Sequence, residues 1–192
     1  IVNKHIRYKY ACKCCEEVVK RAAAPFTPIS KSIATPNLLA HIYTQKFNDH
    51  CPLYRQEHTW QRLGINLSRA TMSNWILSGA EILKPIIELL KEDMNGSNYI
   101  CSDETTINVL NNEKSNNYMW VHMSGNRKQR AVVYEYQESR SGSSTSDFFK
   151  NFKGYHQSDG YAGYNELHNR DDITGVGCMA HVRRKFMDIV KI

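Results

Sequence analysis

The stretch Asn98-Tyr99-Ile100-Cys101-Ser102-Asp103-Glu104-Thr105 carries a short hydrophobic run that leads to an aspartate. A later stretch, Tyr155-His156-Gln157-Ser158-Asp159-Gly160-Tyr161, repeats this arrangement. Each run is β-rich, so each is expected to form a strand that ends at its aspartate. Strands that bring carboxylates to one edge of a sheet commonly build divalent-metal sites for phosphoryl transfer, so Asp103 and Asp159 are predicted metal ligands. Taken singly, each aspartate could instead be a turn residue.

The sequence around these two runs has strand periodicity. β-rich runs at 99–101, 106–110, 118–122 and 131–136 are separated by Asn, Ser, Gly and Lys. A short helix, the Asp159 strand, another short helix, a further strand and a final helix from Ala180 are expected to follow. Three meandering strands followed by alternating helices and strands is the order of a ribonuclease-H-like α/β domain. Residues 96–192 are therefore predicted to form such a domain around a mixed sheet.

Residues 25–95 are predicted to form a small all-helical domain. Thr35 and Pro36 are a good N-cap and first-turn pair, and Leu39, Ile42, Tyr43 and Phe47 follow with helical spacing. A helix over 53–63, a turn that starts at Gly64 and a helix capped by Ser68 give the outline of a helix-turn-helix. Pro85 is expected to kink or restart the last helix.

In a helix-turn-helix, the start of the second helix enters the major groove of DNA. Arg69, Thr71 and Asn74 would then contact phosphates or bases. The alternative is that the same helix is one member of a packed bundle, with Trp75 in its core.

Residues 1–24 contain a cysteine cluster. Cys12 and Cys15 have the C-x₂-C spacing of one zinc knuckle, but the chain has no second such pair, so reduced cysteines without metal are the alternative. The six cysteines do not resemble a secreted disulfide framework, and no signal peptide or membrane-spanning run is evident, so a cytoplasmic location is expected.

The net charge of the chain is +6 and its pI is about 9.0. Such a charge favours a polyanionic partner, because clustered Lys and Arg release counterions from a phosphate backbone, although a generic basic surface would have the same composition. Arg183, Arg184 and Lys185 form a basic patch on the expected last helix, where they could bind DNA phosphates or simply face solvent. His181, nearby, could be a metal neighbour, a phosphate contact or a structural histidine.

Several motifs together resemble transposases of the insertion sequence 66 family. The resemblance covers almost the whole chain and is carried by Pro52-Leu53-Tyr54-Arg55-Gln56-Glu57, Ser68-Arg69-Ala70-Thr71-Met72-Ser73-Asn74-Trp75, Cys101-Ser102-Asp103-Glu104-Thr105-Thr106, Tyr118-Met119-Trp120-Val121, Ser139-Arg140-Ser141-Gly142, Phe152-Lys153-Gly154-Tyr155-His156-Gln157-Ser158-Asp159-Gly160-Tyr161-Ala162-Gly163-Tyr164-Asn165 and Cys178-Met179-Ala180-His181-Val182-Arg183-Arg184-Lys185-Phe186.

The resemblance implies a DDE-type enzyme, in which two Asp and one Glu hold Mg²⁺ or Mn²⁺ for cleavage and transfer of DNA strands. By position, Asp103 and Asp159 are the first two carboxylates, while the Glu belongs to a segment beyond Ile192. The fragment alone is therefore expected to be inactive, and the rival interpretation is a non-catalytic DNA-binding remnant or regulator. The resemblance also implies a bacterial, nucleoid-associated protein that binds double-stranded DNA as a homo-oligomer. Residues 1–24 resemble the downstream part of a zinc finger.

Overall fold

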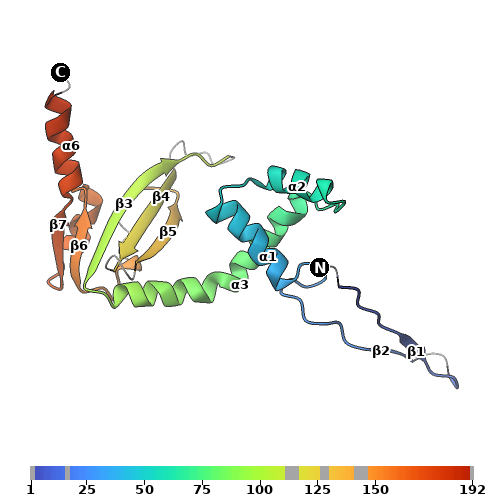
Figure 1. Ribbon diagram of the computed structural model, residues 1–192. Coiled ribbons are helices and arrows are strands. Elements are labelled where there is room, and N and C mark those ends of the chain that lie inside the picture. Colours follow the sequence, from blue (N-terminus) through green and yellow to red (C-terminus); the bar gives the residue numbers. More distant parts are fainter. Residues whose placement is uncertain (1–2, 16–17, 111–116, 126–129, 141–146, 191–192) are drawn as a thin grey trace. The chain divides into compact units, whose positions relative to one another are not determined.

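The computed structural model describes residues 3–15, 18–110, 117–125, 130–140 and 147–190, and the chain divides into two compact units, Ile1–Leu83 and Lys84–Ile192 (Figure 1). The division falls inside helix α3 (Arg69–Asn95), one residue before Pro85. Helix α3 runs through Pro85 without a break, so the expected restart does not occur. Among the described residues, none of the helices combines the length and hydropathy of a membrane-spanning segment.

The first unit contains a two-stranded hairpin and several helices. Strand β1 (Lys9–Ala11) pairs antiparallel with β2 (Val19–Arg21). Helix α1 (Pro36–Tyr43) is followed by the π-helix η1 (Thr44–Asn48), and α2 (Leu53–Arg62) precedes α3. The predicted caps are confirmed: the side chain of Thr35 accepts the N–H of Leu38 at 3.2 Å, and that of Ser68 accepts the N–H of Thr71 at 3.2 Å.

The core of the first unit lies between α1, the turn before α3 and the first turns of α3. Its buried members are Ala34, Leu39, Ile42, Leu67, Met72 and Trp75. The hydroxyl of Tyr43 donates to the carbonyl of Ile76 at 2.8 Å, which ties α1 to α3. Burial of Trp75 confirms that this helix has a packed face, and its exposed side chains stay available for other contacts.

The second unit is built on a five-stranded mixed sheet with the order β5–β4–β3–β6–β7. The strands are β3 (Tyr99–Ile107), β4 (Asn117–Ser124), β5 (Ala131–Gln137), β6 (Gly154–Ser158) and β7 (Ile173–Gly177). Strands β3, β4 and β5 form an antiparallel meander, while β6 and β7 run parallel to β3. This topology is compatible with the predicted ribonuclease-H-like fold.

One expectation about the strands is wrong. Residues 99–101 and 106–110 are not two strands, since β3 is continuous over Tyr99–Ile107. Asp103 therefore lies inside a strand and not at its end, whereas Asp159 directly follows β6 as expected. The polar residues of β3 stay extended because β4 pairs with them along the whole strand, and such tertiary pairing overrides local β propensity.

The core of the second unit covers one face of this sheet. Aromatic side chains dominate it, and the buried members are Met94, Ile100, Trp120, Val133, Phe148, Phe149, Phe152, Tyr164, Leu167 and Ile173. The short helices η2 (Ala162–Tyr164) and α5 (Asn165–His168) supply two of them. Helix α6 (Met179–Val190) follows β7 and contributes no buried residue.

Candidate metal centre

The parallel pairing of β3 with β6 brings the two predicted aspartates together. Cys101 lies opposite Gln157 in this pair, and two residues further along come Asp103 and Asp159. Because side chains alternate along a strand, residues two apart point to the same face. The two carboxylates are therefore neighbours, although 55 residues of chain separate them.

A third ligand-type side chain joins them from α6. One ligand atom from each of Asp103, Asp159 and His181 lies within 4.8 Å of the other two. Both aspartates are exposed, and His181 is half-buried. Carboxylates and imidazoles are both ligand types that divalent ions use in proteins, and here they come from β3, from the residue after β6 and from α6.

Backbone hydrogen bonds fix the start of α6 beside the aspartates. The N–H of Cys178 donates to the carbonyl of Ser158 at 2.9 Å, and the N–H of His181 donates to the carbonyl of Cys178 at 3.0 Å. The pKa of the Cys178 thiol is lowered to about 7, mainly by hydrogen bonding from the backbone amide of His181 and next by the His181 side chain. His181 is thus held next to Asp159 by main-chain contacts.

The carboxylates are themselves oriented by backbone amides. Oδ1 of Asp103 accepts the N–H of Glu104 at 3.0 Å, and Oδ1 of Asp159 accepts the N–H of Tyr161 at 2.9 Å. An ionised carboxylate has about four lone-pair sites, so each keeps acceptor capacity for a cation.

The residues fit a divalent cation. The Nδ1 atom of His181 is buried and has no hydrogen-bond partner among the described residues. A metal ion or a bound molecule would supply the missing partner. Carboxylate oxygens suit Mg²⁺ and Mn²⁺, while imidazole shifts the preference toward transition ions such as Mn²⁺.

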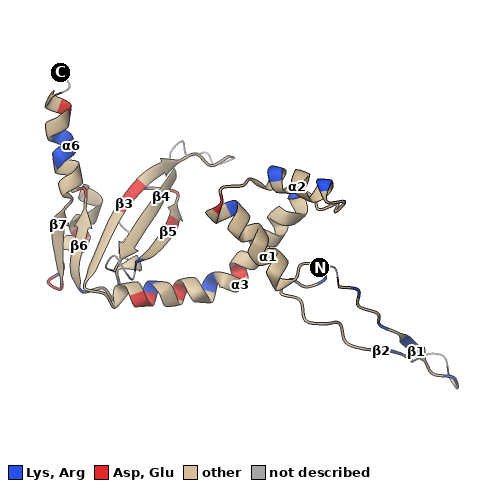
Figure 2. Ribbon diagram, in the orientation of Figure 1, with Lys and Arg blue, Asp and Glu red and all other residues tan. Residues whose placement is uncertain are grey.

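A pocket of about 350 Å³ opens beside this centre. It mixes acidic and basic side chains, and its lining comprises Arg140, Asp159, Gly160, Tyr161, His181, Arg184, Lys185 and Asp188. Figure 2 shows the Lys and Arg residues of α6 as a blue band. Two members of the predicted basic patch, Arg184 and Lys185, therefore line the pocket, and the third, Arg183, is an exposed residue of α6.

A hydrogen-bonded series of three histidines and Ser102 adjoins Asp103, and its members Ser102, His122 and His156 are buried. The hydroxyl of Ser102 lies 2.8 Å from Nδ1 of His122 and 2.9 Å from Nε2 of His156. Nδ1 of His156 lies 2.8 Å from Nε2 of His168. Burial, and then the charge of Lys91, lower the pKa of His122 to about 3. Burial, and then its histidine neighbours, lower the pKa of His156 to about 3.

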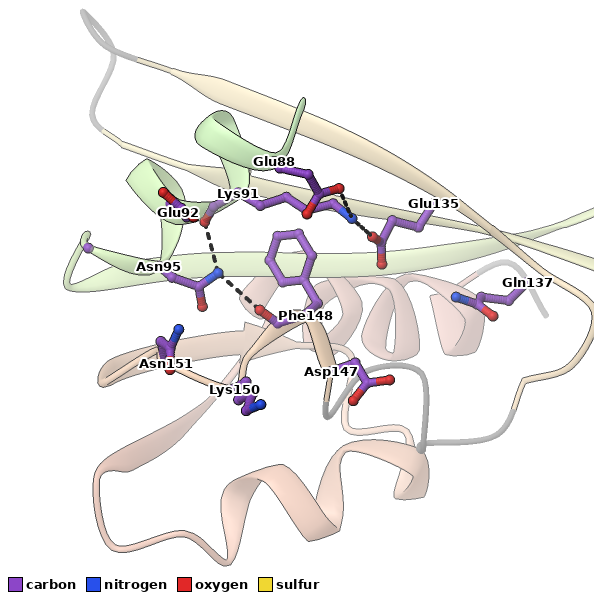
Figure 3. Close-up of a pocket in the computed structure, with 11 residues that line it drawn as sticks. Glu88, Lys91, Glu92, Asn95, Glu135, Gln137, Asp147, Phe148, Lys150 and Asn151 are labelled. Atoms are coloured by element: carbon purple, nitrogen blue, oxygen red, sulfur yellow. Dashed lines mark hydrogen bonds and ion pairs between the residues drawn. The ribbon is translucent and has the colours of Figure 1, made fainter. Parts of the chain in front are cut away.

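A second pocket, of about 650 Å³, lies between α3, β5 and the segment around Phe148 (Figure 3). Lys91 bridges Glu88 at 3.6 Å and Glu135 at 2.5 Å. The side-chain amide of Asn95 donates to the carbonyls of Lys91 and Phe148 at 2.8 and 3.0 Å. These contacts join α3 to the sheet.

The remaining predicted residues lie in the first unit. Arg69, Thr71 and Asn74 occupy the first turns of α3, and their contact with DNA stays a prediction. Cys12 follows β1, and the backbone amides of Cys15 and Cys14 lower the pKa of its thiol. A thiolate is the form that binds zinc, so a zinc half-site at Cys12 and Cys15 stays a prediction.

A protein-family model described as "Transposase IS66 family" matches residues 31–192. The chain belongs to the IS66 transposase family. It is 34% identical over its whole length to the uncharacterized protein y4jD of Sinorhizobium fredii, of which it covers 40%. It is 30% identical over 95% of its length to the uncharacterized protein y4qI of the same organism, covering 36% of it. The chain thus spans about two fifths of the length of these curated relatives.

His181 is the functional candidate that the sequence motifs left undecided. Its signal is the position of His181 in the first turn of the helix that follows β7, because β7 pairs with β6, the strand directly before Asp159. Glu104 and Arg140 belong to the motifs that carry the family resemblance but have no local signal of a role, and the structure pairs them beside the pocket.

Proposed function

We propose that this chain supplies part of the catalytic centre of a DDE-type transposase, which cleaves and transfers DNA strands with Mg²⁺ or Mn²⁺. The observation that carries the proposal is the convergence of Asp103, Asp159 and His181 at one point. A divalent cation at such a site supplies Lewis acidity for attack on a phosphodiester.

The residues of the chain have separate roles in this proposal. Asp103 and Asp159 hold the cation from β3 and from the end of β6, and His181 adds a nitrogen ligand from α6. Arg184 and Lys185 bind phosphates of double-stranded DNA at the adjoining pocket. Arg183, and Arg69, Thr71 and Asn74 of the first unit, extend DNA binding beyond the pocket. The whole enzyme, including its third carboxylate, its homo-oligomeric assembly and a completed zinc finger, is part of the same proposal.

Metal binding and DNA cleavage provide the test. We expect Mn²⁺ to bind the parent chain in calorimetry and to bind Asp103→Asn and Asp159→Asn at least about tenfold more weakly, because each change removes a charged ligand. Asp171→Asn is the matched control, since Asp171 is an exposed acidic residue before β7, at the opposite end of the sheet strands. Equal Mn²⁺ affinity in all four proteins would overturn the metal centre.

Nicking of supercoiled DNA then separates the enzyme from a non-catalytic DNA-binding remnant. Metal-dependent nicking that disappears in Asp159→Asn would support the enzyme. Because the third carboxylate is expected outside this chain, the same assay is made with the whole protein, and salt-sensitive DNA binding without any nicking by the whole protein would support the remnant.

A further inference from the structure

Arg140 approaches the pocket from the sheet side and is held by a buried carboxylate. Its Nε donates to Oε1 of Glu104 at 2.8 Å, and its Nη2 pairs with the same oxygen. The other oxygen of Glu104 accepts the hydroxyl of Tyr164 at 3.0 Å. The side chain of Glu104 is 2% exposed, whereas that of Arg140 is 41% exposed. A nearly buried acid thus anchors a guanidinium that still reaches solvent.

Tyr161 restrains the same guanidinium from another direction. Cζ of Arg140 lies 3.7 Å from the centroid of the Tyr161 ring, and the Tyr161 hydroxyl donates to the backbone carbonyl of Arg140 at 2.8 Å. The backbone N–H of Tyr161 also donates to Asp159 at 2.9 Å. Arg140 is therefore positioned relative to a carboxylate of the candidate metal centre.

A structural ion pair would explain the contact with Glu104, because a buried carboxylate needs a partner. It would not explain why the cation lines a pocket together with Arg184 and Lys185. A guanidinium carries five N–H donors in a planar fork, so one edge can bind Glu104 and one face can stack on Tyr161 while other donors meet a ligand. Phosphate is the ligand that matches such a fork beside other cations.

We propose that Arg140 contacts a phosphate oxygen of the DNA strand beside the metal centre, and that Glu104 and Tyr161 are positioning residues that hold it there. This inference rests on the proposed function. Around the pocket the three cations face the two acidic residues Asp159 and Asp188, so their charges nearly balance. A bound divalent cation would make the pocket clearly positive, and the phosphate contact should strengthen when metal is present.

The salt dependence of DNA binding tests the contact. Anisotropy of a labelled duplex is measured with the full 192-residue chain and Ca²⁺ over a series of KCl concentrations. For Arg140→Gln we expect the slope of log K against log[salt] to become shallower by about 0.9 and the affinity to fall about five- to tenfold, since one phosphate contact is lost. Lys153→Gln is the control for charge, because Lys153 precedes β6 and lies at the strand end opposite Asp159, so its slope should stay at the parental value.

A double variant keeps the test decisive if the single variant fails to fold. Glu104→Gln with Arg140→Gln leaves the net charge of the chain unchanged and leaves no buried carboxylate unpaired, so folding should be retained. The shallower slope should appear in this variant too. A parental slope in the folded double variant would overturn the inference and reduce Arg140 to a structural ion pair. If the parent chain itself shows no salt-dependent DNA binding, the proposed function fails together with the inference.

Discussion

Acidification from about pH 7.5 to about pH 5 is expected to destabilise the second unit, because His122 and His156 are buried in their uncharged form. His122 is 1% exposed and His156 is 0% exposed. In the unfolded chain each imidazole takes up a proton below its ordinary pKa of 6.5, whereas in the folded unit the pKa of each is about 3. The unfolded state therefore binds more protons between these values. The stability that they contribute is complete above pH 6.5 and is lost as the pH falls toward 3.

The size of the effect follows from these two pKa values. At about pH 5 each imidazole should remove about 2 kcal/mol from the free energy of unfolding, and both together about 4 kcal/mol. A loss of this size is a large part of the roughly 5–15 kcal/mol that stabilises an ordinary domain.

Trp120 reports on this unit because it lies in the aromatic core and is 2% exposed. Urea unfolding would be followed by fluorescence in a chain with Trp60→Phe and Trp75→Phe, which leaves Trp120 as the sole tryptophan. His156→Gln should lower stability at pH 7.5 but remove about half of the pH dependence, while the exposed His58→Gln should change neither. A free energy of unfolding that is equal at both pH values, or an unchanged pH dependence in His156→Gln, would refute the reasoning.

Three further substitutions are expected to change stability. Gly175→Ala should lower the free energy of unfolding in urea by about 1–3 kcal/mol, because the added Cβ would lie 2.7 Å from Nδ1 of His168. Gly177→Ala should be close to neutral, because no atom lies within 4 Å of a Cβ added there, and equal effects of the two changes would contradict this. Lys91→Met should cost about 1–3 kcal/mol by removing the partner of Glu135, whose side chain is 17% exposed, and unchanged unfolding would show that water replaces the contact. Thr35→Ala should cost about 1 kcal/mol of first-unit stability, measured by thermal melting, while Thr35→Ser should keep the cap.

The sheet of the second unit was largely predictable from the sequence, because the β-rich runs and the helices between them occur in an ordered series. The convergence of Asp103 and Asp159 followed from the same reasoning. The exact extent of β3 was not predictable, since Asp103 and Glu104 are residue types that are depleted in strands, and they are kept extended by pairing with β4.

The helices of the first unit show a different limit. Leu39 and Ile42 are buried as their spacing predicted, but Phe47 is 58% exposed. The chain changes from α-helix to π-helix at Thr44, so the helical spacing no longer places Phe47 on the buried face. The sequence before Thr44 contains no pattern that predicts the change to a π-helix.

The side chains around the metal centre depend on contacts between distant segments. His181 reaches Asp159 through the bond between Cys178 and the end of β6, and Arg140 reaches Glu104 across 36 positions of sequence. Such pairs have no local signal, because neither partner sets the backbone conformation of the other. These residue pairs can be recognised only once the pairing of the strands is known.

The alignment of β3 with β6 has a consequence for how freely this protein can change. Hydrogen bonds between main-chain amides and carbonyls set the spacing of the two strands, and these bonds do not depend on which side chains are present. Exchanges at neighbouring positions should therefore leave the separation of Asp103 and Asp159 intact. A one-residue insertion in either strand would instead turn one acid to the opposite surface and abolish cation capture in a single step. Tolerance of replacement combined with intolerance of insertion would be the mutational signature of this site.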